Sequence, residues 1–141
     1  MNIKSLLAKP FASVVHRQIK KEQLTAVADQ QSILNQLVKS AKGTQFGKDH
    51  HFDQITDYAS FKNAVPIRDY EGFREYIDQI KKGTQNVLWK GLPLYLAKTS
   101  GTTSGIKYIP ISKDSIGNHI SGARNAILTY MSGSGNTDFA G

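Results

Sequence analysis

Apolar residues recur at helical spacing at the start of the chain, and basic residues occupy the opposite side. The apolar residues are Ile3, Leu7, Phe11, Val14 and Val15. This pattern predicts an amphipathic helix over residues 3–21, bent near Pro10 because proline lacks the N–H that a helix interior uses. We expect its apolar side to pack on later helices of the same chain. A mitochondrial presequence and a helix lying on a membrane surface share this pattern and stay open as alternatives.

Two more helices are predicted before the middle of the chain. The first covers residues 30–41 and ends near Gly43. Its inward positions are Ile33, Leu34, Leu37 and Val38. The second is short, is capped by Asp57 and runs through Ala64. Val65 precedes a proline, which disfavours helical geometry at Val65 and ends this helix.

A third long helix is predicted to start at Asp69 and to end before Gly83. Its core-facing stripe is Tyr70, Phe73, Tyr76, Ile77 and Ile80. A final helix is capped by Ser112. Its predicted inward residues are Ile116, Ile120, Ala123, Ile127 and Met131. The last ten residues, SGSGNTDFAG, have the composition of a loop.

Three short segments have the composition of strands: 87–89 (VLW), 94–98 (LYLAK) and 107–111 (KYIPI). Pro110 favours an edge position for the last of them. Helices mixed with a few short strands predict an α/β fold. Because so few strands cannot build a sheet that buries both faces, we interpret the chain as an incomplete domain.

The composition narrows the class of protein. The chain has 141 residues, about one domain's length, and it has no stretch of apolar residues long enough for a membrane span. It contains no cysteine, which excludes disulfides and a cysteine nucleophile and is typical of a reducing compartment. We therefore expect a cytoplasmic protein without stable membrane insertion.

The net charge of +7 is compatible with anionic ligands of several kinds. Part of the excess belongs to the first helix, where no acidic residue precedes Glu22. The other lysines are scattered and are not interleaved with aromatic residues as in proteins that bind single strands. We therefore expect no nucleic-acid partner.

His50 and His51 are adjacent, which raises the question of a metal site. Neighbouring side chains diverge, and no acidic or histidine partner lies at ligand spacing on a regular element. We interpret both as surface histidines and expect no protein metal site.

The segment between the last two strand candidates carries the most specific chemistry. Residues 99–107 read TSGTTSGIK, with five hydroxyl residues and two glycines before the closing lysine. Small residues let backbone N–H groups approach phosphate oxygens, while hydroxyls and an ammonium complete the set of donors. A flexible polar hairpin connection has the same composition. A Walker A loop differs, because its lysine directly follows the second glycine and a helix comes next.

The spacing of this segment resembles the phosphate loop of acyl-adenylate-forming enzymes, TSGTT-G-x-x-K. Lys107 stands six residues after Gly101, as the pattern requires, and Ser104 stands at the pattern's last glycine. The surroundings resemble the GH3 family of acyl-acid amido synthetases. The segments that carry this resemblance are Phe46-Gly47, Phe61, Val65-Pro66-Ile67, Asp69-Tyr70, Val87-Leu88-Trp89 and Lys107-Tyr108-Ile109-Pro110.

This resemblance implies a fold similar to that of the luciferase-type adenylating enzymes. It also implies a ligase that uses ATP and Mg²⁺ to activate a carboxylic acid and passes the acyl group to an amino acid. Residues 1–141 would be the amino-terminal portion of the adenylating domain, with a helix at 1–21 and a strand–phosphate loop–strand unit at 94–111. Since the family's later motifs have no counterpart here, we expect the isolated chain to be inactive.

The resemblance also assigns roles within the loop. Lys107 would stabilise the charge that develops on the phosphates, which makes it the expected catalytic residue. The expected nucleotide-binding residues are Ser100, Gly101, Thr102, Thr103, Ser104, Gly105 and Lys107. Two other classes stay open at this point: a protein that binds or hydrolyses nucleotide through a phosphate loop, and a non-enzymatic interaction module that uses the basic first helix.

Overall fold

A computed structural model of the chain describes residues 3–99 and 105–137, and the side chains from Leu7 onward within them. Most of the described residues are helical, and a single two-stranded sheet lies among them. The chain divides into two compact units, residues 1–27 with 116–141 and residues 28–115. The long elements are α1 (Ile3–Ala41), α4 (Arg74–Lys81), β1 (Tyr95–Thr99), β2 (Lys107–Ile111) and α5 (Lys113–Ser134). The short ones are α2 (Gln45–Asp49), α3 (Tyr58–Ala64) and the 3₁₀ turn η1 (Glu71–Phe73).

Helix α1 is one element of 39 residues, whereas the sequence predicts two separate helices at 3–21 and 30–41. The intervening residues 22–29 (EQLTAVAD) contain neither glycine nor proline, so nothing local ends the helix between them. Pro10 lies within α1 and does not end it. Among the described residues, no helix has the length and apolar content that a membrane crossing requires.

The first unit is held by a small core between α1 and α5. Ala12 is fully buried against Leu128 and Met131, with Ala8 and Val15 packed beside them. The first helix therefore packs on a later helix, as expected, and Val15 of the predicted residues takes part in the contact. Leu7, Phe11 and Val14 are more than half exposed. Alanines at positions 8 and 12 allow the two helices to approach closely. The prediction did not include them because it followed the large apolar residues.

Helix α5 begins as the sequence predicts. The Ser112 hydroxyl accepts the Ser115 N–H at 3.0 Å. Of the predicted inward residues, Met131 is buried and Ile116 is half-buried. The prediction is wrong for Ile120, Ala123 and Ile127, which are exposed, and Leu128 is buried instead. The helix also continues to Ser134, so the predicted loop over the last ten residues is wrong for its first three.

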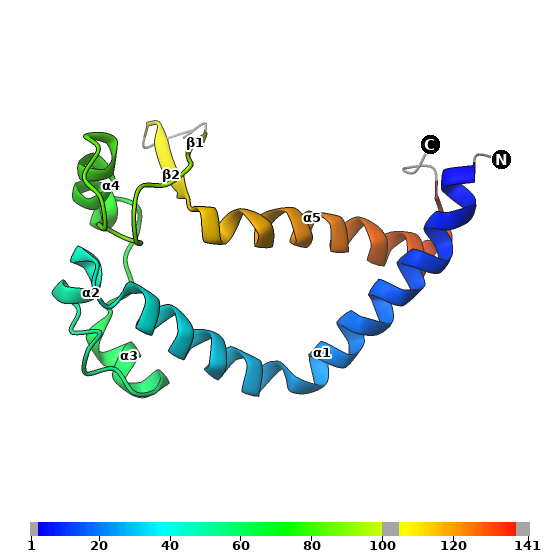
Figure 1. Ribbon diagram of the computed structural model, residues 1–141, viewed down its shortest axis with the longest axis horizontal. Helices are drawn as coiled ribbons and strands as arrows, with labels where there is room; N and C mark the ends of the chain where they lie inside the picture. Colours follow the sequence, from blue (N-terminus) through cyan, green and yellow to red (C-terminus); the bar gives the residue numbers. More distant parts are fainter. Residues whose placement is uncertain (1–2, 100–104, 138–141) are drawn as a thin grey trace. The chain divides into compact units, whose positions relative to one another are not determined.

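The second unit has two cores, and the first joins the end of α1 to the segments that follow. Val38, Ala41 and Phe52 are buried there, with Leu34, Phe61 and Val65 among the residues packed against them. Ile33 and Leu37, predicted to face inward, are about half exposed. The buried face follows the spacing 34, 38, 41, which is equally helical. Figure 1 shows α2 and α3 beside this end of α1.

A tight connection leads from α1 into α2. The Thr44 hydroxyl donates to the Ala41 carbonyl at 2.7 Å and accepts the Gly47 N–H at 3.0 Å. A side chain at position 47 would place its Cβ 2.2 Å from the Ala41 oxygen, so only glycine fits this approach. Phe46 N–H then donates to the Val87 carbonyl at 3.0 Å, which ties α2 to the segment before the sheet.

Both ends of helix α3 are as predicted from the sequence. The Asp57 carboxylate accepts the Ser60 N–H at 2.7 Å, and the Ser60 hydroxyl accepts the Asp57 N–H at 3.1 Å, which forms a reciprocal capping box. At the other end Val65 has extended backbone geometry. The Asp57 carboxylate also accepts the Ser60 hydroxyl at 2.8 Å, and the two hydrogen bonds that the carboxylate accepts from Ser60 lower the pKa of Asp57.

We predict that Asp57→Ala lowers the midpoint of thermal unfolding at pH 7 and that the difference from wild type shrinks below about pH 4. The folded-state pKa lies below the unfolded one, so the contribution of the charge is present above the ordinary aspartate pKa. It is lost as the pH falls through the folded-state value. Asp57→Ser keeps a cap acceptor without an ionisable group. The difference between the unfolding midpoints of Asp57→Ser and Asp57→Ala should therefore not change with pH. An equal loss in Asp57→Ala at pH 7 and pH 3 would contradict the contribution of the charge, and no loss at either pH would contradict the cap.

The second core lies between η1, α4 and the sheet. Ile77, Ile80 and Val87 are buried, and Tyr70, Phe73 and Tyr76 pack against them as the stripe predicts. The helix is shorter than predicted: Asp69 Oδ1 accepts the Gly72 N–H at 3.1 Å, but the first turn is 3₁₀ and α4 begins at Arg74. Residues 87–89 are not a strand; Val87 is 1% exposed and fills the core from an irregular segment.

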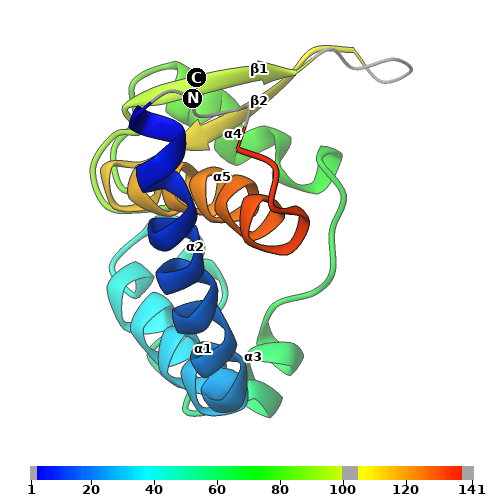
Figure 2. The same ribbon diagram turned by 90° about the vertical axis from the view of Figure 1, so that its right-hand side faces the viewer.

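The two remaining strand candidates form an antiparallel hairpin, with β1 one residue later than predicted. Leu96 and Tyr108 share one face and pack against the second core. Tyr95 and Ile109 lie on the other face and are about half exposed or more. Pro110 sits opposite Leu96 in this two-stranded sheet. Helix α4 lies beside the hairpin, as Figure 2 shows.

Candidate functional site

The hairpin brings the two ends of the predicted phosphate loop together. Thr99, the last residue of β1, pairs directly with Lys107, the first residue of β2. Gly105 has a φ of +79°, in the left-handed region that favours glycine. The other predicted nucleotide-binding residues, Ser100, Gly101, Thr102, Thr103 and Ser104, lie outside the described residues. The structure therefore places the lysine and the second glycine at the end of the hairpin.

Lys107 is half-buried, and its ammonium faces an aromatic ring. Its Nζ lies 5.7 Å from the centroid of the Tyr70 ring, within the range of a cation–π contact. Among the residues that the structure describes, no carboxylate forms an ion pair with Lys107. The ammonium is thus held on one side by the ring and keeps hydrogen-bond donors for an anionic ligand.

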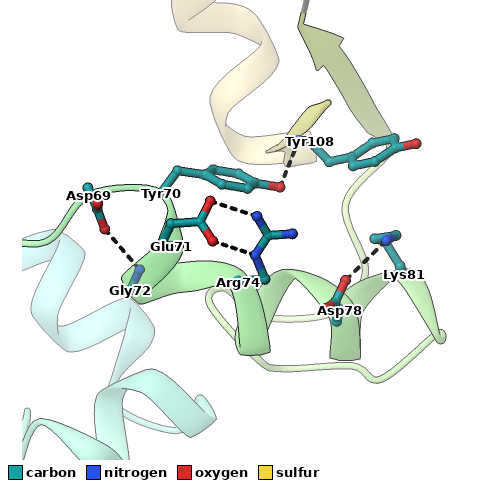
Figure 3. A network of polar contacts seen from close by, with 8 residues as sticks. All are labelled: Asp69, Tyr70, Glu71, Gly72, Arg74, Asp78, Lys81 and Tyr108. Carbon is teal, nitrogen blue, oxygen red and sulfur yellow. Dashed lines mark hydrogen bonds and ion pairs between the residues drawn. The ribbon is translucent and has the colours of Figure 1, made fainter. Parts of the chain in front are cut away.

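Tyr70 also contacts the backbone of β2. Its hydroxyl accepts the Tyr108 N–H at 2.9 Å, so one side chain contacts two consecutive residues of the strand. The guanidinium of Arg74 lies 5.9 Å from the same ring and makes two hydrogen bonds of 2.6 Å with Glu71. Figure 3 shows this network above α4.

The same network fixes the charges of its acidic and basic members. The hydrogen bond from Arg74 is the main cause of the lowered pKa of Glu71, and the charge of Lys107 contributes in the same direction. Lys81 donates to Asp78 at 3.0 Å, which raises the lysine pKa, and its Nζ lies 5.0 Å from the Tyr108 ring. The last residue of α4, Lys81, therefore contacts Tyr108 of β2, and the first, Arg74, contacts Tyr70.

A polar pocket of about 290 Å³ opens between α2, η1 and α4. Its lining is mainly polar: Gln45, Asp49, Arg68, Glu71, Gly72, Glu75, Tyr76 and Gln79. The Tyr76 hydroxyl donates to Asp49 at 2.8 Å. Burial and this hydrogen bond raise the pKa of Tyr76. Of the loop residues that the sequence singles out, Gly105 and Lys107 are described by the structure, and neither lines this pocket.

His50 contacts Arg68, one of the residues that line this pocket. The prediction that His50 lies at the surface is wrong. It is 6% exposed, its Nδ1 is 2.9 Å from the Ala64 carbonyl oxygen, and its Nε2 is 3.1 Å from an Arg68 nitrogen. Nδ1–H therefore donates to the carbonyl, and Nε2 accepts from the guanidinium. A signal for this burial exists in the sequence, since His50 follows the core residue Phe46 by four positions. His51 is exposed, as predicted.

Within residues 3–99 and 105–137, no group of three histidine, aspartate or glutamate side chains is arranged to hold a metal ion.

Comparison with known protein families identifies the family of this chain. The model of the GH3 family N-terminal domain matches residues 15–138. The chain therefore belongs to the GH3 family, in agreement with the resemblance found in the sequence.

Its relatives include plant amido synthetases. The chain is 29% identical over 87 residues to a jasmonoyl–L-amino acid synthetase of Nicotiana attenuata. The aligned segment covers 60% of this chain and 15% of the relative. It is 32% identical over 94 residues to the indole-3-acetic acid-amido synthetase GH3.15 of Arabidopsis thaliana. That alignment covers 65% of this chain and 16% of the relative. The chain thus spans about a sixth of the length of these relatives. No solved structure matches the chain significantly.

Proposed function

We propose that this chain is part of an ATP-dependent ligase that activates a carboxylic acid as an acyl-adenylate and transfers the acyl group, to an amino acid. The observation that carries the proposal is the place of Lys107. It stands at the end of the hairpin, opposite Thr99, with an ammonium that no described carboxylate pairs. The loop that it closes has the spacing of the adenylate-forming pattern.

Formation of an acyl-adenylate is favoured by a positive charge close to the phosphates of ATP. A carboxylate oxygen attacks the α-phosphorus of ATP, a new P–O bond forms, and the bond to the pyrophosphate oxygen breaks. Negative charge then moves onto the leaving pyrophosphate, where a preorganised ammonium stabilises it more strongly than it stabilises bound ATP. Lys107 performs this electrostatic task and transfers no proton. Hydroxyl and N–H donors of Thr102, Thr103 and Ser104 complete the phosphate contacts.

Magnesium, when bound with ATP, neutralises part of the phosphate charge. The loop fits this arrangement, because its ammonium, hydroxyls and backbone N–H groups donate to phosphate oxygens. Mg²⁺ would then be bound by the phosphates of ATP. ATP and Mg²⁺ are therefore the proposed cofactors, with no metal ligand assigned to this chain.

The second half of the reaction transfers the acyl group. The amine of an amino acid attacks the activated carbonyl carbon, an amide bond forms, and AMP leaves with the oxygen that the carboxylate contributed. The names of the relatives, which include a jasmonoyl–amino acid synthetase and indole-3-acetic acid-amido synthetases, support this class of substrates.

Residues 1–141 form, in this proposal, the amino-terminal portion of a larger luciferase-like adenylating domain. The exposed face of the hairpin supports it, because Tyr95 and Ile109 on this face are about half exposed or more. Further parts of the domain would cover this face and supply the pocket for the base and ribose.

The experiment that tests the proposed function is exchange of labelled pyrophosphate into ATP by the full-length protein. We predict exchange that depends on an added carboxylic acid, with indole-3-acetate, jasmonate and benzoate as the first probes and a wider panel of carboxylic acids after them. The dependence arises because only reversible adenylation joins pyrophosphate and acid in one equilibrium. Carboxylate-independent release of phosphate would instead indicate a nucleotide hydrolase, and absence of both reactions over the whole panel would favour an interaction module.

A further inference from the structure

A single side chain outside the loop links the base of the loop to the core. Tyr70 lies between the second core and the first two residues of β2. Its hydroxyl accepts the Tyr108 N–H at 2.9 Å, and its ring centroid lies 5.7 Å from the ammonium of Lys107. The hydroxyl thus fixes the strand at the residue after the lysine, and the ring faces the lysine side chain itself.

Tyr70 is in turn held in place by two sets of contacts. Its ring packs with the core formed by Ile77, Ile80 and Val87. The Arg74 guanidinium lies 5.9 Å from the centroid of the ring, and Glu71 keeps that guanidinium in position through two hydrogen bonds of 2.6 Å. In Figure 3 the Tyr70 hydroxyl points to the Tyr108 backbone, and the Arg74 guanidinium lies beside Glu71, below this ring.

We propose that Tyr70 is a positioning residue that sets the place of the Lys107 ammonium at the phosphates. This inference rests on the proposed function of Lys107. A lysine side chain has a flexible four-carbon stem, and freezing it during the reaction costs conformational entropy. A ring on one side of the ammonium and a fixed backbone at the next residue restrict the lysine before ATP binds, so less of that cost remains.

The test is a double-mutant cycle in the full-length protein, measured by carboxylate-dependent pyrophosphate exchange. Tyr70→Phe removes the hydroxyl and keeps the ring; we expect a loss of about fivefold in the exchange rate. Tyr70→Leu removes both contacts, and we expect a loss of about 50-fold. In a Lys107→Ala background the same Tyr70→Leu change should cost less than about twofold, because its effect passes through the lysine.

A matched control is available on α4. Tyr76→Phe also removes a hydroxyl at the edge of this core, but that hydroxyl donates to Asp49 and does not contact β2. We expect exchange in Tyr76→Phe within about twofold of wild type. If Tyr70→Leu costs as much in the Lys107→Ala background as in wild type, or if Tyr76→Phe loses as much as Tyr70→Phe, the positioning role is wrong.

A second readout does not need catalysis. Hydrogen exchange of the Tyr108 amide, measured by mass spectrometry without ATP, should become about tenfold faster in Tyr70→Phe and stay unchanged in Tyr76→Phe. An unchanged Tyr108 amide in Tyr70→Phe would overturn the positioning contact by itself. Wild-type protein without any carboxylate-dependent exchange would instead overturn the proposed function, and the role of Tyr70 with it, so the two failures are distinguishable.

Discussion

Lys107→Ala is expected to lower carboxylate-dependent pyrophosphate exchange by about 100-fold or more in the full-length protein. The reason is that the ammonium stabilises charge which is larger in the transition state than in bound ATP, so its removal lowers kcat more than it raises the KM for ATP. Folding should change little, because no described carboxylate pairs with this lysine and its ring contact is a weak one. Steady-state exchange kinetics and a thermal unfolding curve measure the two effects.

Lys98→Ala is the matched control for this prediction. Lys98 is an exposed lysine on the neighbouring strand, paired with Tyr108, so its loss changes the net charge equally. We expect exchange in Lys98→Ala within about threefold of wild type at physiological ionic strength. Equal losses of exchange in both variants would mean that Lys107 acts only through general electrostatic attraction of ATP. Unchanged exchange in Lys107→Ala would mean that the lysine has no role in the reaction.

Gly47→Ala is expected to destabilise the fold by about 3 kcal/mol, through a steric clash with backbone. The added Cβ would lie 2.2 Å from the Ala41 oxygen and 3.1 Å from the Lys42 oxygen, atoms that cannot move aside as a flexible side chain can. The Ala41 carbonyl also accepts the N–H and the hydroxyl of Thr44, so its displacement would break the start of α2. A fall of about 5–10 °C in the midpoint of thermal unfolding is the expected measurement.

Gly43→Ala provides the comparison for the Gly47 variant. A Cβ at position 43 meets nothing within 4 Å. The same chemical change four residues earlier should therefore shift the midpoint by no more than about 2 °C. A Gly47→Ala protein as stable as Gly43→Ala would show that the close approach of α2 to the end of α1 does not occur in solution.

Elements that depend on local chemistry could be predicted from the sequence. Asp57 and Val65 mark the two ends of α3 because a carboxylate cap and a following proline act within a few residues. The two strands are predicted to within one residue for the same reason, since the composition of each segment is a local signal. The spacing of residues 99–107 also singles out Lys107, whose role at the phosphates stays a prediction.

Features that depend on contacts between distant segments could not be predicted in this way. Val87 is buried because α2 bonds to its carbonyl from 41 residues earlier, whereas its apolar neighbours suggested a strand. The burial of Ala12 depends on α5, and a pattern of large apolar residues favours Leu7 instead. Tyr70 looked like one more core residue; its contact with Tyr108 spans 38 positions, and nothing near it in the sequence indicates that contact.

The central claim is that a carboxylate oxygen attacks the α-phosphate of ATP, and transfer of ¹⁸O tests it most directly. The full-length protein is incubated with ATP, the twenty amino acids and a carboxylic acid that supports exchange, labelled with ¹⁸O in its carboxylate. Acyl transfer breaks the bond between the carbonyl carbon and the phosphate oxygen, so the account predicts that the AMP formed carries one ¹⁸O atom. AMP without label, or ADP with the label in inorganic phosphate, would contradict it.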